Sequence, residues 1–193
     1  MKEEIIHLVN ARRVFTFIFV LLMAVTLGCA ASGDKKAGSR QVAAPQPMDI
    51  PENVSCGKCG MYPAKYPRWQ SQIIFKDGSM TPFDGCKCMF NFLFAVDEYD
   101  KMHSREDVSV AWVKDFNSGT WINAEDAYYV VGSNMMGPMG KELIPFADQG
   151  EAMKFHQEQG GDMMNYAEIS PGVLKTLGMG GMKMKHGSNH MKM

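Results

Sequence analysis

One succession of local sequence patterns, strand, strand, helix and strand, occurs twice between residues 52 and 177. The first half has expected strands over 69–75, 79–83 and 108–113. The turn signal Asp77-Gly78 separates the first two strands. Asp84 suits the N-cap of a helix that runs to about Tyr99. Residues 52–117 are therefore predicted to form a ββαβ module.

The second half repeats that order with different residues. Its expected elements are strands over 127–131, 142–146 and 163–169, a helix over 149–159 and a short helix near 171–177. Asp148 is the expected N-cap of the longer helix, in the position that Asp84 takes in the first half. We therefore expect an α+β fold of two tandem ββαβ modules, the second over residues 118–177.

The N-terminus has the layout of an export signal. Lys2, Arg12 and Arg13 precede an apolar run over 14–27 that ends at Gly28-Cys29. This run of about fourteen residues is shorter than the roughly twenty that a helix needs to cross a bilayer. A transmembrane anchor is therefore the weaker alternative. The segment also resembles the lipobox of bacterial lipoproteins, in which the cysteine receives the lipid.

This leader predicts an exported chain that is held at the periplasmic face of a bacterial membrane by lipid on Cys29. Residues 1–28 are then the lipoprotein signal peptide. Residues 29–51 are rich in Gly, Ser, Ala and Pro and are expected to form a flexible tether. The formal net charge of −1 provides no basic field for nucleic acid, so nucleic-acid binding is excluded as a leading function.

Two close pairs of cysteines remain once the lipidated one is set aside. The first is Cys56-Gly-Lys-Cys59-Gly-Met61, in which two glycines let the backbone curl round an ion. Thiolate with thioether suits Cu(I), whereas zinc recruits thiolate, imidazole or carboxylate, so Met61 favours copper over zinc. The second pair, Cys86 and Cys88, is expected in the first turn of a helix, where the macrodipole should lower thiol pKa values.

Three other uses of these four cysteines stay open. Exported cysteines commonly form disulfides, and a bridge between the two pairs has better geometry than one within Cys86-x-Cys88. A four-thiolate zinc or iron site has plausible spacing. A thioredoxin-like redox site is the weakest alternative, because Pro63 and Pro67 follow where such a motif would open a helix.

The methionine content is the other unusual feature, because the chain has 18 methionines, more than core packing requires. Met135, Met136 and Met139 lie in an expected loop, where Gly and Pro would expose them as soft donors. The tail over 178–193 is expected to be disordered without a ligand. Its candidate metal-binding residues are Met179, Met182, Met184, His186 and His190. A dispensable solvated tail is the alternative.

The sequence gives little support for an enzyme. No Ser-His-Asp arrangement, phosphate loop or pair of catalytic carboxylates stands at a persuasive position. His103 and His156 lie on or beside expected helices without a partner motif, so we interpret them as solvated rather than metal-bound.

Several motifs spread over residues 56–169 form a combination that points to one family. They are Cys59-Gly-Met61, Pro63, Trp69, Asp77-Gly78, Phe83-Asp84, the segment 135–140, Ile144-Pro-Phe146 and Gly160-Gly161. Together they resemble NosL, the family of nitrous oxide reductase accessory lipoproteins. The lipobox-like Cys29 agrees with that resemblance.

The resemblance implies a periplasmic lipoprotein that binds Cu(I) and has a fold similar to the organomercurial lyase MerB. Its partners would be the copper enzyme maturation machinery of nitrous oxide reductase or another client cuproprotein. By motif it implies Cys59 and Met61 as the first ligands, with Met135, Met136 and Met139 next.

Two features depart from that family's pattern, namely the extra cysteines Cys56, Cys86 and Cys88 and the Met/His-rich tail. They leave open another copper pathway, copper sequestration, or an interaction module stabilised by zinc or disulfides. MerB-like enzymes combine cysteines with an acid, so Asp84 near Cys86 keeps an enzyme that cleaves carbon–metal bonds as a remote alternative.

Overall fold

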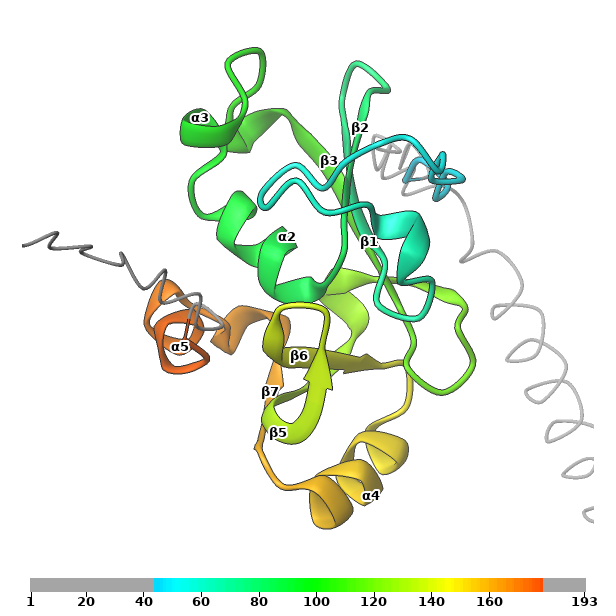
Figure 1. Cartoon of the computed structure of the whole chain (residues 1–193), viewed down its shortest axis with the longest axis vertical. Coiled ribbons are helices and arrows are strands. Elements are labelled where there is room, and N and C mark those ends of the chain that lie inside the picture. Colours follow the sequence, from blue (N-terminus) through cyan, green and yellow to red (C-terminus); the bar gives the residue numbers. More distant parts are fainter. Residues whose placement is uncertain (1–43, 179–193) are drawn as a thin grey trace, which may run out of the picture. The chain divides into compact units, whose positions relative to one another are not determined.

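The computed structural model describes residues 44–178, shown in colour in Figure 1. The expected signal peptide over 1–28, the expected lipidation site Cys29, most of the tether and all the candidate metal ligands of the tail lie outside these residues. None of the helices within residues 44–178 has the length and apolar character that a bilayer span requires. The described part mixes helices with two antiparallel sheets.

The first sheet holds four strands in the order β2-β1-β3-β4. They are β1 (Ser71–Phe75), β2 (Met80–Phe83), β3 (Val108–Lys114) and β4 (Trp121–Asn123). The hairpin β1–β2 forms as expected, because Asp77 accepts a hydrogen bond from the Ser79 backbone and Gly78 adopts a positive φ of 87°. β4 pairs with β3, so the first sheet extends beyond residue 118.

The second sheet has three strands in the order β6-β5-β7. They are β5 (Tyr128–Gly137), β6 (Gly140–Phe146) and β7 (Asp162–Asn165). In each sheet the first strand of its half lies between the second and the third. The interpretation of the halves as two tandem modules stays a prediction.

The helices agree with the expected positions to different degrees. They are α2 (Cys86–Leu93), α3 (Val96–Tyr99), α4 (Gln149–Gln159) and α5 (Pro171–Thr176), with short 3-10 helices η1 (Pro63–Lys65), η2 (Arg105–Asp107), η3 (Ala124–Asp126) and η4 (Tyr166–Glu168). Asp148 caps α4 as predicted, accepting a hydrogen bond from the Glu151 backbone at 3.0 Å. The expected strand 163–169 ends at Asn165, because Asn165 and Glu168 form a capping box that opens η4.

Two local predictions were wrong. The helix expected up to Tyr99 breaks after Leu93, because Ala95 leaves the helical conformation at φ −150° and α3 starts anew. The segment 134–139 is mostly strand rather than loop, since β5 continues to Gly137, and its pairing with β6 shifts register between Val131 and Met136. Met135 and Met136 are therefore strand residues.

Helix α2 lies between the two sheets, against β1, β2 and β6 (Figure 1). One continuous core contains residues of α2 and of both sheets. Phe90 of α2 meets Tyr129 of β5 edge to face, with ring centroids 5.5 Å apart. The buried Tyr129 hydroxyl donates a hydrogen bond to the Ala124 carbonyl at 2.7 Å. Packing from both sides thus fixes the helix that carries Cys86 and Cys88.

His103 has partners that the sequence did not indicate. Its Nδ1 lies 2.7 Å from an Asp100 carboxylate oxygen and its Nε2 lies 3.1 Å from one of Asp77. The ring stacks on Phe75 with centroids 3.9 Å apart. The hydrogen bonds with Asp100 and then Asp77 raise the pKa of His103 above its ordinary value, because both carboxylates favour the charged ring.

This arrangement predicts that the domain loses stability as pH rises past neutrality. A histidine with a raised folded pKa stabilises fully below its unfolded pKa of about 6.5, and the contribution is lost as pH rises through the folded value. Urea denaturation of the reduced protein between pH 6 and 9 should show this slope, and His103→Gln should reduce it. The matched variant His156→Gln keeps His103 and should keep the slope; loss of the slope there would contradict the assignment.

Candidate metal centre

The loop that contains Cys56, Cys59 and Met61 closes on itself. The Cys56 backbone N–H donates to the Met61 carbonyl at 2.6 Å, and the Gly60 N–H donates to the Cys56 carbonyl at 3.1 Å. Gly60 adopts a positive φ of 78°, which a side chain would strain. The sequence expectation of a loop that curls with the help of glycine is therefore met at Gly60.

The same loop is attached to the edge of the first sheet. β2 is an edge strand and contains Pro82, whose carbonyl accepts a hydrogen bond from Gly57 at 3.0 Å. A Cβ on Gly57 would collide with the Thr81 methyl group, so the close approach requires glycine. The edge of β2 thereby sets the position of the Cys56–Cys59 loop.

Asp84 follows β2 directly, and its side chain lies next to Cys59 of this loop. It is fully buried, and its Oδ1 accepts a hydrogen bond from the Cys59 thiol at 3.3 Å. Its other carboxylate oxygen is buried and has no hydrogen-bond partner in the part of the chain that the structure describes. A buried polar atom without a partner is costly, and a metal ion is one group that would satisfy it.

Asp84 is therefore not the helix cap that the sequence predicted. The N-cap position of α2 is Gly85, which offers no side chain. Glu142 of β6 accepts the hydrogen bond from the Lys87 backbone instead, in a very short contact. A Cβ on Gly85 would collide with that carboxylate. Local sequence patterns do not indicate Glu142 for this role, because its strand lies in the other half of the chain.

Three thiols and one carboxylate meet where these elements converge. The ligand atoms of Cys56, Cys59, Asp84 and Cys88 all lie within 4.8 Å of one another. We call this group the thiol cluster. Cys56 and Cys88 are buried, whereas Cys59 is half-buried. Between residues 44 and 178 all four cysteines are free thiols.

The thiols of the cluster differ in pKa. The hydrogen bond from Cys88, helped by the Cys59 and Lys58 backbone N–H groups, lowers the pKa of Cys56 to about 7. Burial raises the pKa of Cys59 to about 12. The hydrogen bond to Cys56 and burial raise the pKa of Cys88 far above its ordinary value. The metal-free cluster therefore holds at most one thiolate near neutral pH, and a soft cation would displace the remaining protons.

Cys86 lies outside the thiol cluster. It precedes Cys88 by two helical residues, so their side chains point about 200° apart round the helix axis. Burial, and next the negative charge of Glu142, raise the pKa of Cys86. The expectation that the helix N-terminus lowers both thiol pKa values was wrong, because burial and negative neighbours outweigh the macrodipole.

The four methionines predicted as metal ligands within residues 44–178 lie in different parts of the structure. Met61 lies in the loop over residues 56–61, which we call the cluster loop, and its backbone N–H donates a hydrogen bond to the Cys59 sulfur. Met139 lines one pocket together with Cys59 and Cys88. Met135 packs on a separate apolar cluster that contains Phe146. Met136 is 57% exposed.

A pocket of about 510 Å³ opens onto the thiol cluster, and we call it the thiol pocket. Its lining comes from the cluster loop, α2, α3, the β5–β6 turn and the end of α5. The lining residues are Lys58, Cys59, Lys87, Cys88, Asn91, Tyr99, Met139, Leu174, Lys175 and Gly178. A metal ion or a ligating side chain can reach two of the three thiols from this side.

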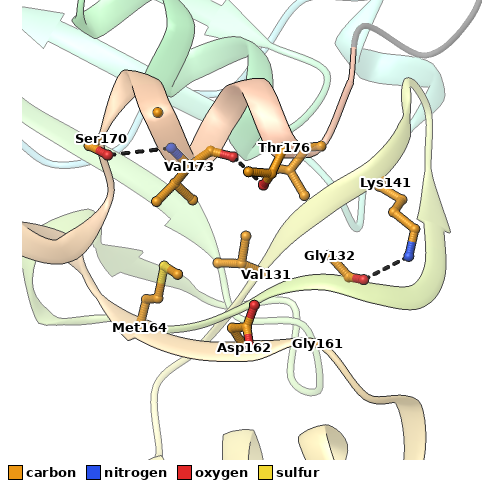
Figure 2. A pocket seen from close by; sticks show the side chains of 11 residues that line it. Val131, Gly132, Lys141, Gly161, Asp162, Met164, Ser170, Val173 and Thr176 are labelled. Atoms are coloured by element: carbon orange, nitrogen blue, oxygen red, sulfur yellow. Dashed lines mark hydrogen bonds between the residues drawn. The ribbon is translucent and has the colours of Figure 1, made fainter.

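A larger pocket of about 730 Å³ lies elsewhere, between α5 and the strands β5 and β7 (Figure 2). Val131 and Met164 contribute apolar surface to it, and Lys141 donates to the Gly132 carbonyl at its border. No cysteine lines it. The candidate metal-binding thiols are therefore found at the thiol pocket and not at this larger one.

Comparisons with known proteins agree on one family. The NosL family model matches residues 47–174. The copper-binding lipoprotein NosL of Stutzerimonas stutzeri is 26% identical over 178 residues, covering 91% of this chain and 87% of that protein. The protein of the same name from Achromobacter cycloclastes is 41% identical over 59 residues, covering 30% and 31%.

The fold has a solved relative. The crystal structure of the copper chaperone NosL from Shewanella denitrificans superimposes with a TM-score of 0.58 at 25% identity. The alignment covers 66% of this chain and 97% of that one.

The role of Glu142 in holding α2 can be tested separately from metal. Glu142→Ala leaves the buried Lys87 N–H without an acceptor and should lower the free energy of unfolding by about 1–3 kcal/mol. Glu142→Gln keeps an acceptor oxygen and should cost less than about 1 kcal/mol. Urea denaturation of the reduced, metal-free protein measures both, and equal losses in the two variants would refute the capping role.

Proposed function

The chain belongs to the NosL family, and we propose that it is an exported metallochaperone that binds Cu(I) as its cargo and passes it to a client protein. The family's relatives are named for copper binding and for copper chaperoning rather than for catalysis. We therefore do not propose an enzyme.

The thiol cluster is the observation that carries this proposal. Three sulfur atoms from the cluster loop and α2 lie close enough to bind one ion. Cu(I) prefers soft sulfur donors, and both kinds of sulfur are available, because Met139 lines the same pocket as two of the thiols. Cys59 and Cys88, together with Cys56, are the proposed first ligands, with Met61 and Met139 as thioether candidates.

Zinc is the competing ion, and Asp84 is the reason. A set of three thiolates and one carboxylate would complete a tetrahedral zinc site. The family assignment favours copper over a structural zinc or disulfide-stabilised interaction module. Asp84 then accepts the hydrogen bond from the Cys59 thiol in the metal-free protein and is not a Cu(I) ligand.

The proposed location follows from the leader sequence. Lipid on Cys29 would anchor the mature chain at the periplasmic face of a bacterial membrane. The names of the relatives, which include the word lipoprotein, support this anchor. The proposed client is nitrous oxide reductase or a related copper enzyme, reached through its maturation machinery, with copper sequestration as the alternative.

Copper binding at the thiol cluster predicts a contrast between two cysteines. Cys59→Ser should lower the Cu(I) affinity by about 100-fold or more, since even supporting residues of metal sites commonly contribute 10–100-fold. Cys86→Ala, the matched cysteine outside the cluster, should stay within about 10-fold of the parent protein. Anaerobic Cu(I) titration of the reduced protein against a competing chelator measures both. An equal loss in the two variants would place the ion elsewhere.

Asp84 separates copper from zinc. Because Cu(I) selects sulfur and zinc accepts carboxylate oxygen, Asp84→Asn should lower the zinc affinity by about 10–100-fold and the Cu(I) affinity by less than about 10-fold. Competition titrations with each metal test this, and thermal melting shows whether the variant is folded. The reverse pattern would make Asp84 a copper ligand and contradict the proposed role.

A further inference from the structure

The lining of the thiol pocket carries charge of one sign. It includes Lys58, Lys87 and Lys175 and no carboxylate. The rest of the lining is mostly uncharged, with Tyr99, Leu174 and Met139 as its larger apolar side chains. The pocket is thus a partly apolar depression with a positive border directly over two thiols of the cluster.

The side chains of the three lysines make different contacts. The Lys87 ammonium donates to the carbonyls of Met139 and Lys141 at 2.6 and 2.8 Å, so it is committed to the fold. Lys58 lies over the Tyr99 ring, 4.3 Å from its centroid, and Lys175 is exposed in the last turn of α5. Within residues 44–178 neither Lys58 nor Lys175 forms an ion pair. Both charges remain available to a second molecule.

The chain continues from this pocket with more positive charge. Gly178 lines the pocket and is followed by the tail residues Lys183, Lys185 and Lys192, with no Asp or Glu after Glu168. Clustered charge of one sign attracts a partner of opposite sign and speeds its encounter. The same charge repels a basic partner.

We propose that the thiol pocket is the docking surface for the copper-receiving protein, and that this partner presents its copper ligand on an acidic segment. The inference rests on the proposed copper function and names the partner's chemistry. The pocket is large enough for a few side chains and ends at Cys59 and Cys88, so a ligand inserted there meets the ion directly. An anionic membrane would match the lysines but offers no soft ligand for the pocket floor.

Transfer to two synthetic peptides tests the proposal. Both carry the same Cys-x-x-Cys copper ligand, flanked by glutamates in one peptide and by lysines in the other, with matched Cu(I) affinity. The protein is first loaded with Cu(I) and its metal content measured, which tests the copper function separately. Stopped-flow transfer should be about 10-fold or more faster to the acidic peptide at low salt, and the difference should shrink in high salt.

Charge reversal at the pocket should abolish that preference. Lys175→Glu should slow transfer to the acidic peptide several-fold without changing the Cu(I) affinity. Lys58→Glu should also slow this transfer, and because Lys58 lies between two proposed ligands its rates are compared at equal copper loading. Lys154→Glu, an exposed lysine of α4 away from the pocket, makes the same change in net charge and should have little effect. Thermal melting of each variant checks that it is folded.

Several outcomes would overturn the docking proposal. Equal transfer rates to the two peptides, or a preference that survives both pocket reversals, would show that the lysines do not select the partner. Binding to phosphatidylglycerol vesicles that is lost in the same reversals would assign these lysines to the membrane. Faster transfer to both peptides after removal of residues 179–193 would make the tail the occupant. A protein that takes up no Cu(I) would instead end the copper function and the docking proposal together.

Discussion

The position of helix α2 depends on one buried carboxylate from the other half of the chain. Glu142 on β6 accepts the Lys87 N–H, which Gly85 cannot do at the N-cap. Gly85 leaves room for that carboxylate, and the Lys87 side chain in turn binds two carbonyls next to β6. The helix start is therefore fixed by β6 as much as by its own sequence. The position of Cys88 in the cluster therefore depends on this contact.

This arrangement brings several acidic groups together, so it must limit its negative charge. Asp84, Glu142 and the thiols lie in a largely buried region, where several charges of one sign cannot coexist. Burial raises the pKa of Glu142 to about 7 and that of Cys59 to about 12, so the metal-free site avoids most of the charge by keeping protons. A soft cation that binds the thiols as thiolates would displace the thiol protons. Metal binding and proton release are thus coupled at this site.

Local sequence patterns predicted what depends on local chemistry. The hairpin β1–β2 and the capped helix α4 lie where alternation, turn residues and Asp148 placed them. The same reasoning failed at Asp84, because local sequence does not indicate that Glu142, far along the chain, accepts the hydrogen bond from the first turn of α2. The cysteines of the cluster were found by residue type alone. Which three of them meet, and that Cys86 does not, depends on helix orientation between two sheets.

The uneven burial of the cluster suits handover better than storage. Structural metal sites are closed by protein ligands, whereas sites that exchange a ligand keep one side open. Cys56 and Cys88 are buried and Cys59 is half-buried, but only Cys59 and Cys88 line the pocket that opens to solvent. An incoming sulfur ligand can therefore reach the ion before the last protein thiol leaves. In the proposed transfer, Met139 on the pocket wall would supply a neutral thioether, a weaker soft donor, along that path.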